Sequence, residues 1–230
     1  MVESILDKEE FEVYKAVKLY LKQNHFFKID EITSYLKFNL DRSLNLNTLK
    51  IEKVLQSLLK KNLIAPRSKL LYEDILSNQN RKLIYDFIES NPGCYLNEIM
   101  KTTSLGTHQT IWHKNILKKF QFIRSINIDN HEIYFKSTLD STNDQIIYYL
   151  KNESVKKIIK FMENIETGFQ ATEISEKLKM HYNTARKYIN ILLDLELITI
   201  NKEGDKKFYL LNAQNYYDTI ENLRELKIIS

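Results

Sequence analysis

The chain has 230 residues, of which 43% are hydrophobic and 28% charged, with only four Gly, two Pro and one Cys. No apolar run approaches the roughly 20 residues that a membrane-spanning helix needs, and the first residues show no secretory signal. The single cysteine, Cys94, excludes an internal disulfide framework and is typical of a reducing compartment. These features exclude a membrane protein, a secreted mini-protein and a disordered tail. We therefore expect a helix-rich cytoplasmic protein without a membrane span.

The net charge of +4 is concentrated in the first 69 residues, which contain 13 Lys and Arg against 9 Asp and Glu. The segments 70–140 and 141–230 are each balanced. Such a small excess does not favour nucleic-acid binding through a broad basic surface, but it leaves open binding through a few placed residues.

Residues 1–69 predict three helices, near 7–24, 29–38 and 46–61, followed by a stunted hairpin. We expect the hairpin to be stunted because Pro66 interrupts its second half, and proline cannot donate to a strand ladder. A helical lead-in is expected at 70–76.

Residues 70–140 predict a first helix from apolar residues that share one face, and this helix ends at the Asn-Pro-Gly sequence of 91–93. A short second helix carries Leu96 and Ile99, and a third helix runs over 107–120. Alternating residues then predict a hairpin with strands at 122–127 and 132–136.

Residues 141–230 predict the same order of elements. The segment 144–150 is expected to run into a first helix at 154–163, and further helices are expected at 171–178 and 181–194. A hairpin of 197–201 and 207–211 follows. Beyond it, an apolar stripe predicts a terminal helix; its residues are Tyr216, Ile220, Leu223 and Leu226.

An internal repeat relates these segments. Residues 98–134 align with 173–209 without a gap, and LLKKNLI at 58–64 matches LKKFQFI at 117–123. The first copy has about eight extra residues, around 38–45, before its last helix. Helix, helix, turn, helix and hairpin form a winged helix-turn-helix. The predicted fold is mainly α with small β wings: three tandem winged helix-turn-helix domains at 1–69 (wing-poor), 70–140 and 141–212, and a C-terminal amphipathic helix at 213–230.

Residues 75–113 read ILSNQNRKLIYDFIESNPGCYLNEIMKTTSLGTHQTIWH, and this segment resembles archaeal winged-helix regulators related to the ArsR and MarR families. Their pattern is an apolar first helix, Asn-Pro-Gly, a second helix with Glu-Ile, and a third helix ending in His-Leu-x-x-Leu. Residues 172–198 resemble the same pattern. The resemblance implies a DNA-binding transcriptional regulator, although winged helices also serve as protein-interaction modules in membrane-sorting and transcription-initiation complexes.

One residue departs from this pattern. The Leu expected after the third-helix His is Lys114, whereas the aligned residues Leu55 and Ile189 are apolar. Lys114 belongs to the helix face that should pack inward. Its ammonium group reaches solvent over a buried stem, or Lys114 is an engineered substitution, or it marks a surface that this protein uses differently. If Lys114 is buried and poorly solvated, replacing it with Leu should stabilise the protein by about 1–3 kcal/mol.

The third helix of a DNA-binding winged helix enters the major groove, and its hairpin contacts the backbone or minor groove. The second-copy candidates for DNA contact are Thr107, His108, Gln109, Trp112 and Asn115. The third-copy candidates are His181, Tyr182, Asn183, Arg186, Lys187 and Asn190 on the helix, and Lys202, Lys206 and Lys207 on the wing. Arg186 suits a guanine edge and Lys187 a phosphate. Double-stranded DNA is therefore the expected partner.

The alternative is a protein-interaction scaffold built from the same domains. Ile111 and Trp112 make the second-copy face partly apolar, which suits a protein partner or a contact between domains. Tyr216, Ile220 and Leu223 suggest a homodimer through the terminal helix, unless this helix packs on its own domain.

Enzymatic chemistry is not expected. Four Gly cannot build a Gly-rich phosphate loop. His108 and His113 are five positions apart and do not share a helix face as zinc ligands do. Cys94 lacks neighbouring ligands, so we expect no metal and no cofactor.

Overall fold

The computed structural model describes residues 2–40, 46–163, 167–226 and 228. Within these ranges helices dominate and two small sheets are present, which agrees with the predicted mainly α class. The chain divides into two compact units. The first comprises 1–89, 95–125 and 134–138, and the second comprises 90–94, 126–133 and 139–230. The tip of the hairpin at 123–136 therefore belongs to the second unit.

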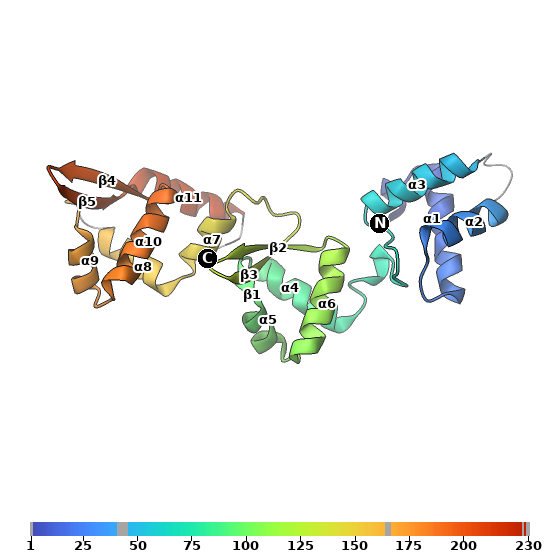
Figure 1. Cartoon of the computed structure of the whole chain (residues 1–230), viewed down its shortest axis with the longest axis horizontal. Helices are drawn as coiled ribbons and strands as arrows, with labels where there is room; N and C mark the ends of the chain where they lie inside the picture. The colour runs from blue at the N-terminus through green and yellow to red at the C-terminus, as the bar shows by residue number, and fades with distance from the viewer. Residues whose placement is uncertain (1, 41–45, 164–166, 227, 229–230) are drawn as a thin grey trace. The chain divides into compact units, whose positions relative to one another are not determined.

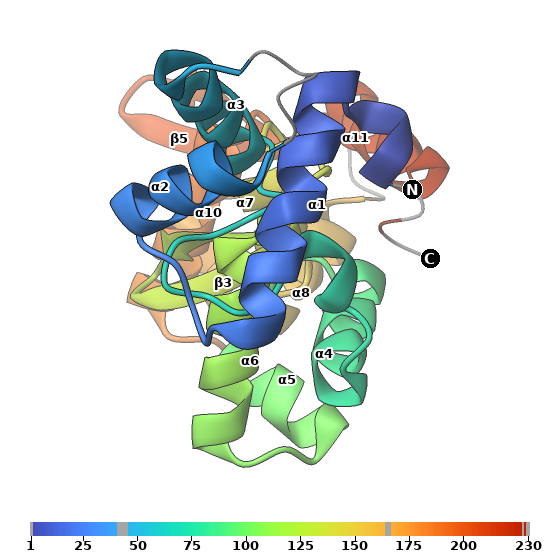
Figure 2. The same ribbon diagram turned by 90° about the vertical axis from the view of Figure 1, so that its right-hand side faces the viewer.

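The first unit begins with a short 3₁₀ helix, Val2–Ile5, and three α-helices: α1 (Lys8–Gln23), α2 (Ile29–Asn39) and α3 (Thr48–Lys60). Asp7 fixes the start of α1 because its side chain accepts from the N–H of Glu10, and the Glu10 carboxylate accepts from the N–H of Asp7. The three helices lie side by side (Figure 1 and Figure 2). The insertion predicted around 38–45 falls partly at 41–45, outside the described residues.

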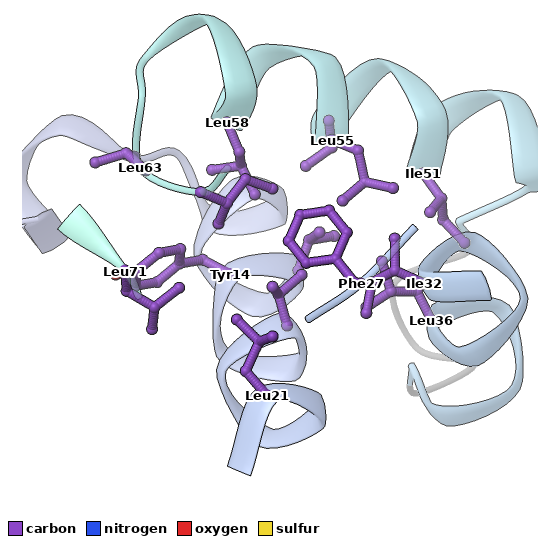
Figure 3. Packing of buried hydrophobic residues seen from close by; sticks show 14 residues of the cluster. Tyr14, Leu21, Phe27, Ile32, Leu36, Ile51, Leu55, Leu58, Leu63 and Leu71 are labelled. Carbon is purple, nitrogen blue, oxygen red and sulfur yellow. The ribbon is translucent and has the colours of Figure 1, made fainter. Parts of the chain in front are cut away.

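Apolar side chains from α1, α2 and α3 form a common core. Figure 3 shows Phe27 between residues of α2 and α3, with Tyr14 and Leu21 on α1. Phe27, Ile32, Leu36 and Leu58 have no exposed surface. Each such side chain contributes about 1.5–3 kcal/mol relative to an exposed one, so this core holds the three helices together.

The middle of the chain contains the expected helices and hairpin. The elements are the 3₁₀ helix Tyr72–Asp74, α4 (Gln79–Ser90), β1 (Cys94–Tyr95), α5 (Leu96–Thr103), α6 (Thr107–Lys119), β2 (Ile123–Ile128) and β3 (His131–Lys136). The strands form a sheet in the order β1-β3-β2. Asp129 and Asn130 both have positive φ angles, as the tight turn between β2 and β3 requires. The lead-in predicted at 70–76 is helical only over the single 3₁₀ turn.

The rest of the second unit follows the same order. Its elements are α7 (Asp144–Leu150), α8 (Glu153–Met162), α9 (Ala171–Lys177), α10 (Tyr182–Asp194), β4 (Ile198–Glu203), β5 (Lys206–Leu211) and α11 (Ala213–Glu225). The prediction that 144–150 runs into the next helix was wrong. The chain breaks there because the Asn152 side chain accepts from the N–H groups of Ser154 and Val155 and so starts a new helix, α8.

The sequence offset of 75 residues also relates these elements. α6 and α10 begin and end 75 residues apart, as do both strands of the two hairpins. The residue two positions after each helix, Gln121 or Glu196, has a positive φ angle, as does Asn62 after α3. These left-handed residues end the helices in the same way. After α3, no strand occurs among residues 61–78, where we expected a stunted hairpin.

Lys114 is buried in the first unit, with only 7% of its surface exposed. Its Nζ donates to the hydroxyl of Tyr134 at 3.2 Å and lies 5.2 Å from the centre of the Tyr134 ring. The idea that this ammonium reaches solvent is therefore wrong. The hydrogen bond also removes the basis for expecting Lys114→Leu to stabilise the protein, because the substitution would take a donor from a buried hydroxyl.

Gly168 provides a test of packing in the second unit. A Cβ atom at this position would lie 2.7 Å from Cβ of Phe208 and 2.9 Å from Cδ1 of Leu210. The next residue, Phe169, exchanges two backbone hydrogen bonds with Tyr209, so the segment cannot easily move away from β5. We expect Gly168→Ala to lower the free energy of unfolding by about 1–3 kcal/mol, the usual cost of overpacking.

Chemical denaturation of Gly168→Ala measures this effect. The matched control is Gly106→Ser, because the space around Gly106 is open and its backbone is that of a helix N-cap, where Ser is favoured. Equal stability of the two variants would contradict the close approach at Gly168.

Candidate nucleic-acid interface

Helix α10 separates an apolar face from a polar one. Ala185, Ile189 and Leu192 point inward and have no exposed surface. The helix starts at His181, whose Nδ1 accepts from the N–H of Asn183 at 3.2 Å. All the predicted DNA-contacting residues of this region are exposed: His181, Tyr182, Asn183, Arg186, Lys187 and Asn190. The repeat of inward residues at three- and four-residue steps leaves the polar ones on the outer face.

The β4–β5 hairpin adds further cations. Lys202 pairs with Lys207 across the ladder and Glu203 pairs with Lys206, so three lysines lie near its tip. All three lysines are exposed, as are Glu203 and Asp205. Figure 1 shows the hairpin after the end of α10 in the same unit. The tip has a positive excess, reduced by the two carboxylates.

Arg186 and Lys187 differ in their surroundings. Arg186 has no ion-pair partner among the residues that the structure describes. The Nζ of Lys187 lies 3.1 Å from Oδ2 of Asp129 in the β2–β3 turn and 5.4 Å from the ring centre of Tyr188. The same Asp129 oxygen lies 3.4 Å from the hydroxyl of Tyr149. The sequence identified Asp129 only as a turn residue and carries no signal for this ion pair.

The outer face of α6 is different from that of α10. Thr107, His108, Gln109 and Asn115 are exposed, and Trp112 has 56% of its surface exposed. Ile111 is half-buried. None of these predicted residues carries a permanent positive charge, and the lysines at the end of α6 are engaged: Lys118 donates to Ser125, and Lys119 donates to the carbonyl of Pro66.

His113, on the inner side of α6, is buried and its Nδ1 has no hydrogen-bond partner among the described residues. Burial, and secondarily the charge of Arg81, lower the pKa of His113. No group of three or more His, Cys, Asp or Glu within the described part of the chain is arranged to hold a metal ion.

The terminal helix does not present the whole stripe that we expected. Leu223 has no exposed surface, so it packs within its own unit and is not free to contact a partner. Tyr216 and Ile220 are half-buried and line a cavity together with α8. The prediction of Leu223 as a protein contact was therefore wrong, because the residue completes the core beneath α11.

The sequence is similar to that of a curated archaeal protein. The chain is 31% identical over 150 residues to the uncharacterized HTH-type transcriptional regulator MJ1398 of Methanocaldococcus jannaschii. The match covers 65% of this chain and 38% of that protein, so the chain spans less than half the length of its relative. The sequence matches no protein-family model.

Among solved structures, the chain is similar to the DIP2311 protein from Corynebacterium diphtheriae, with a TM-score of 0.24 and 10% identity. That similarity covers 60% of this chain and 27% of the other, and it is too low to define a shared fold. Among the described helices, none has both the length and the apolar character needed to cross a bilayer.

Proposed function

We propose that this chain is a DNA-binding transcriptional regulator that reads duplex DNA through α10 and the β4–β5 hairpin. The observation that carries the proposal is the exposed polar face of α10, with Arg186 at its centre and a lysine-bearing hairpin following in the same unit. The similarity to the HTH-type transcriptional regulator from Methanocaldococcus jannaschii supports the proposal. The similar segment makes up 38% of that regulator. The site of action would be the cytoplasm.

We also propose that the chain comprises three helix-turn-helix domains, at 1–69, 70–140 and 141–212, of which the second and third carry a hairpin wing and the first does not. The common offset of 75 residues between α6 and α10, and between their two hairpins, supports the relation of the second domain to the third. In the third domain, Arg186 would pair with a guanine edge in the major groove while Asn183 and Asn190 face adjacent bases. Lys202, Lys206 and Lys207 would contact phosphates beside the groove.

Titration of labelled duplex DNA, followed by fluorescence anisotropy at several salt concentrations, tests the proposal. We expect binding at low salt that weakens linearly on a log–log plot, with a slope of about 0.9 per phosphate contact. Because the chain's net charge is only +4, affinity per chain should be modest. Absence of binding to both random and genomic duplexes at low salt would contradict the proposal.

A protein-interaction scaffold is the second candidate, and it is favoured by α6. Trp112, the one Trp of the sequence, is exposed beside the half-buried Ile111, and the predicted outer face lacks cations. Exposed aromatic residues of this kind are common at protein interfaces. Trp112 fluorescence distinguishes the two candidate functions of α6. A change in Trp112 emission when DNA is added would place α6 in the DNA interface. Unchanged Trp112 emission while α10 binds DNA would favour a protein partner for α6.

The ion pair between Asp129 and Lys187 predicts that Asp129 limits DNA affinity. A phosphate must compete with the Asp129 carboxylate for the same ammonium group. Exposed pairs contribute about 0.2–1 kcal/mol, so Asp129→Asn should tighten DNA binding by roughly 1.5- to 5-fold at low salt. The anisotropy titration measures this gain. The gain should shrink in the Lys187→Ala background; an equal gain there would mean that Asp129 acts only by general repulsion.

A further inference from the structure

A cavity of about 830 Å³ lies between α8 and α11 in the second unit. Helix α8 lines it with residues spaced at i, i+3, i+4 and i+7: Lys156, Ile159, Lys160 and Glu163. Helix α11 lines it with residues spaced at i, i+4 and i+8: Tyr216, Ile220 and Arg224. These spacings put each set on one helix face, so the two faces oppose each other across the cavity.

The cavity has an apolar part and a cationic rim. Ile159 is almost fully buried, and Leu150 and Ile220 are half-buried beside it. Four cationic residues and one acidic residue line the cavity, although the sequence as a whole is nearly balanced. Lys156 pairs with Glu153 at 2.8 Å, whereas Lys160 and Arg224 have no ion-pair partner among the described residues.

The polar groups of the cavity suit an acceptor-rich ligand. Burial, and then the neighbouring Glu163, raise the pKa of Tyr216, and the Tyr216 hydroxyl is hydrogen-bonded to the Glu163 side chain. Lys160 and Arg224 supply charged donors from opposite helices. A ligand would therefore meet donors at the rim and hydrocarbon beneath them.

We propose that this cavity binds a small organic anion, in which one carboxylate or sulfonate is attached to an aromatic or branched apolar body. The volume lies within the range of about 300–1,000 Å³ that is usual for small-molecule pockets. The apolar body would cover Ile159 and Ile220, and the acid group would pair with Lys160 and Arg224. A polyphosphate would leave the apolar part uncovered, and a neutral ligand would leave two cations without a partner. This inference does not depend on DNA binding.

A matched pair of fluorescent probes tests the inference without DNA. Anilinonaphthalene sulfonate has an aromatic body and one acid group, and phenylnaphthylamine is its neutral counterpart. We expect the sulfonate to bind at one site per chain, at least about tenfold more tightly than the neutral probe. The Lys160→Ala, Arg224→Ala double variant should lose about tenfold or more in sulfonate affinity, whereas Lys157→Ala, the adjacent lysine on α8 outside the cavity lining, should bind like the parent.

Several results would overturn the inference. They are equal affinity for the two probes, a double variant that binds the sulfonate like the parent, or many weak sites instead of one. Both substituted residues are exposed, so circular dichroism melting should show that the variants fold like the parent. Sedimentation of the parent measures its oligomeric state. If the parent is a dimer that does not bind the sulfonate, a second copy of the chain covers the cavity and the inference is wrong.

Discussion

Replacing Arg186 and Lys187 together with Ala is expected to weaken binding to duplex DNA by about tenfold or more at low salt. Arg186 is exposed on the outer face of α10 without an ion-pair partner among the described residues, and a bidentate contact with guanine contributes about 1–3 kcal/mol. Lys187 would hold a phosphate after leaving Asp129. Its loss should reduce the salt slope by about one and weaken binding evenly across sequences.

The matched control removes the same charge from elsewhere. Lys8 and Lys22 are exposed on α1 in the other unit, so the Lys8→Ala, Lys22→Ala variant has the same net charge as the α10 variant. If both double variants lose the same affinity, DNA is attracted by total charge and α10 is not the reader. If only the α10 variant loses affinity, and the single Arg186→Ala variant also loses sequence preference, α10 is the reader.

Replacing Glu10 with Ala is expected to lower the free energy of unfolding by about 2–4 kcal/mol at neutral pH. Only 5% of Glu10 is exposed, yet its carboxylate accepts from Nζ of Lys61 at 2.6 and 2.7 Å and from Oγ of Ser57 at 2.6 Å. These bonds join α1 to the end of α3. Lys61 is 38% exposed and can return to water in the variant, which limits the loss. The control is Glu12→Ala on the same helix, because the one ion pair of Glu12 within the described part of the chain is an exposed pair with Lys15.

The stabilisation by Glu10 should depend on pH. Burial by itself raises the pKa of Glu10, but hydrogen bonds from Lys61, Ser57 and the N–H of Asp7 together outweigh burial and hold that pKa below its ordinary value. A carboxyl group whose pKa is lower in the folded state stabilises the protein above the unfolded pKa, and this contribution disappears as the pH falls through the folded pKa. Urea denaturation from pH 7 to pH 3 should therefore show the parent losing its advantage over Glu10→Gln. A constant difference across this range would contradict the argument.

Much of the local structure could be predicted from the sequence. The apolar spacing of Ala185, Ile189 and Leu192 predicted both the limits of α10 and its outward polar residues. The hairpins could be predicted because a tight turn is determined by a few neighbouring residues. In the β2–β3 turn, Asp129 and Asn130 adopt the positive φ angles that such a turn requires. The break before α8 was missed because an Asn cap was read as helix interior, although the residue itself was a usable signal.

The sequence by itself determined the helices, their inward faces and the repeated order of elements, because periodicity and capping act over a few residues. Only the tertiary structure decided which side chains meet. It paired Lys114 with Tyr134, 20 residues away, and Lys187 with Asp129, 58 residues away. It also buried Leu223 on the inner face of α11, whereas Tyr216 and Ile220 of the same helix line the cavity that α11 forms with α8. These contacts depend on how elements far apart in the chain pack together, and the helical period of 3.6 residues contains no information about the partner of a face.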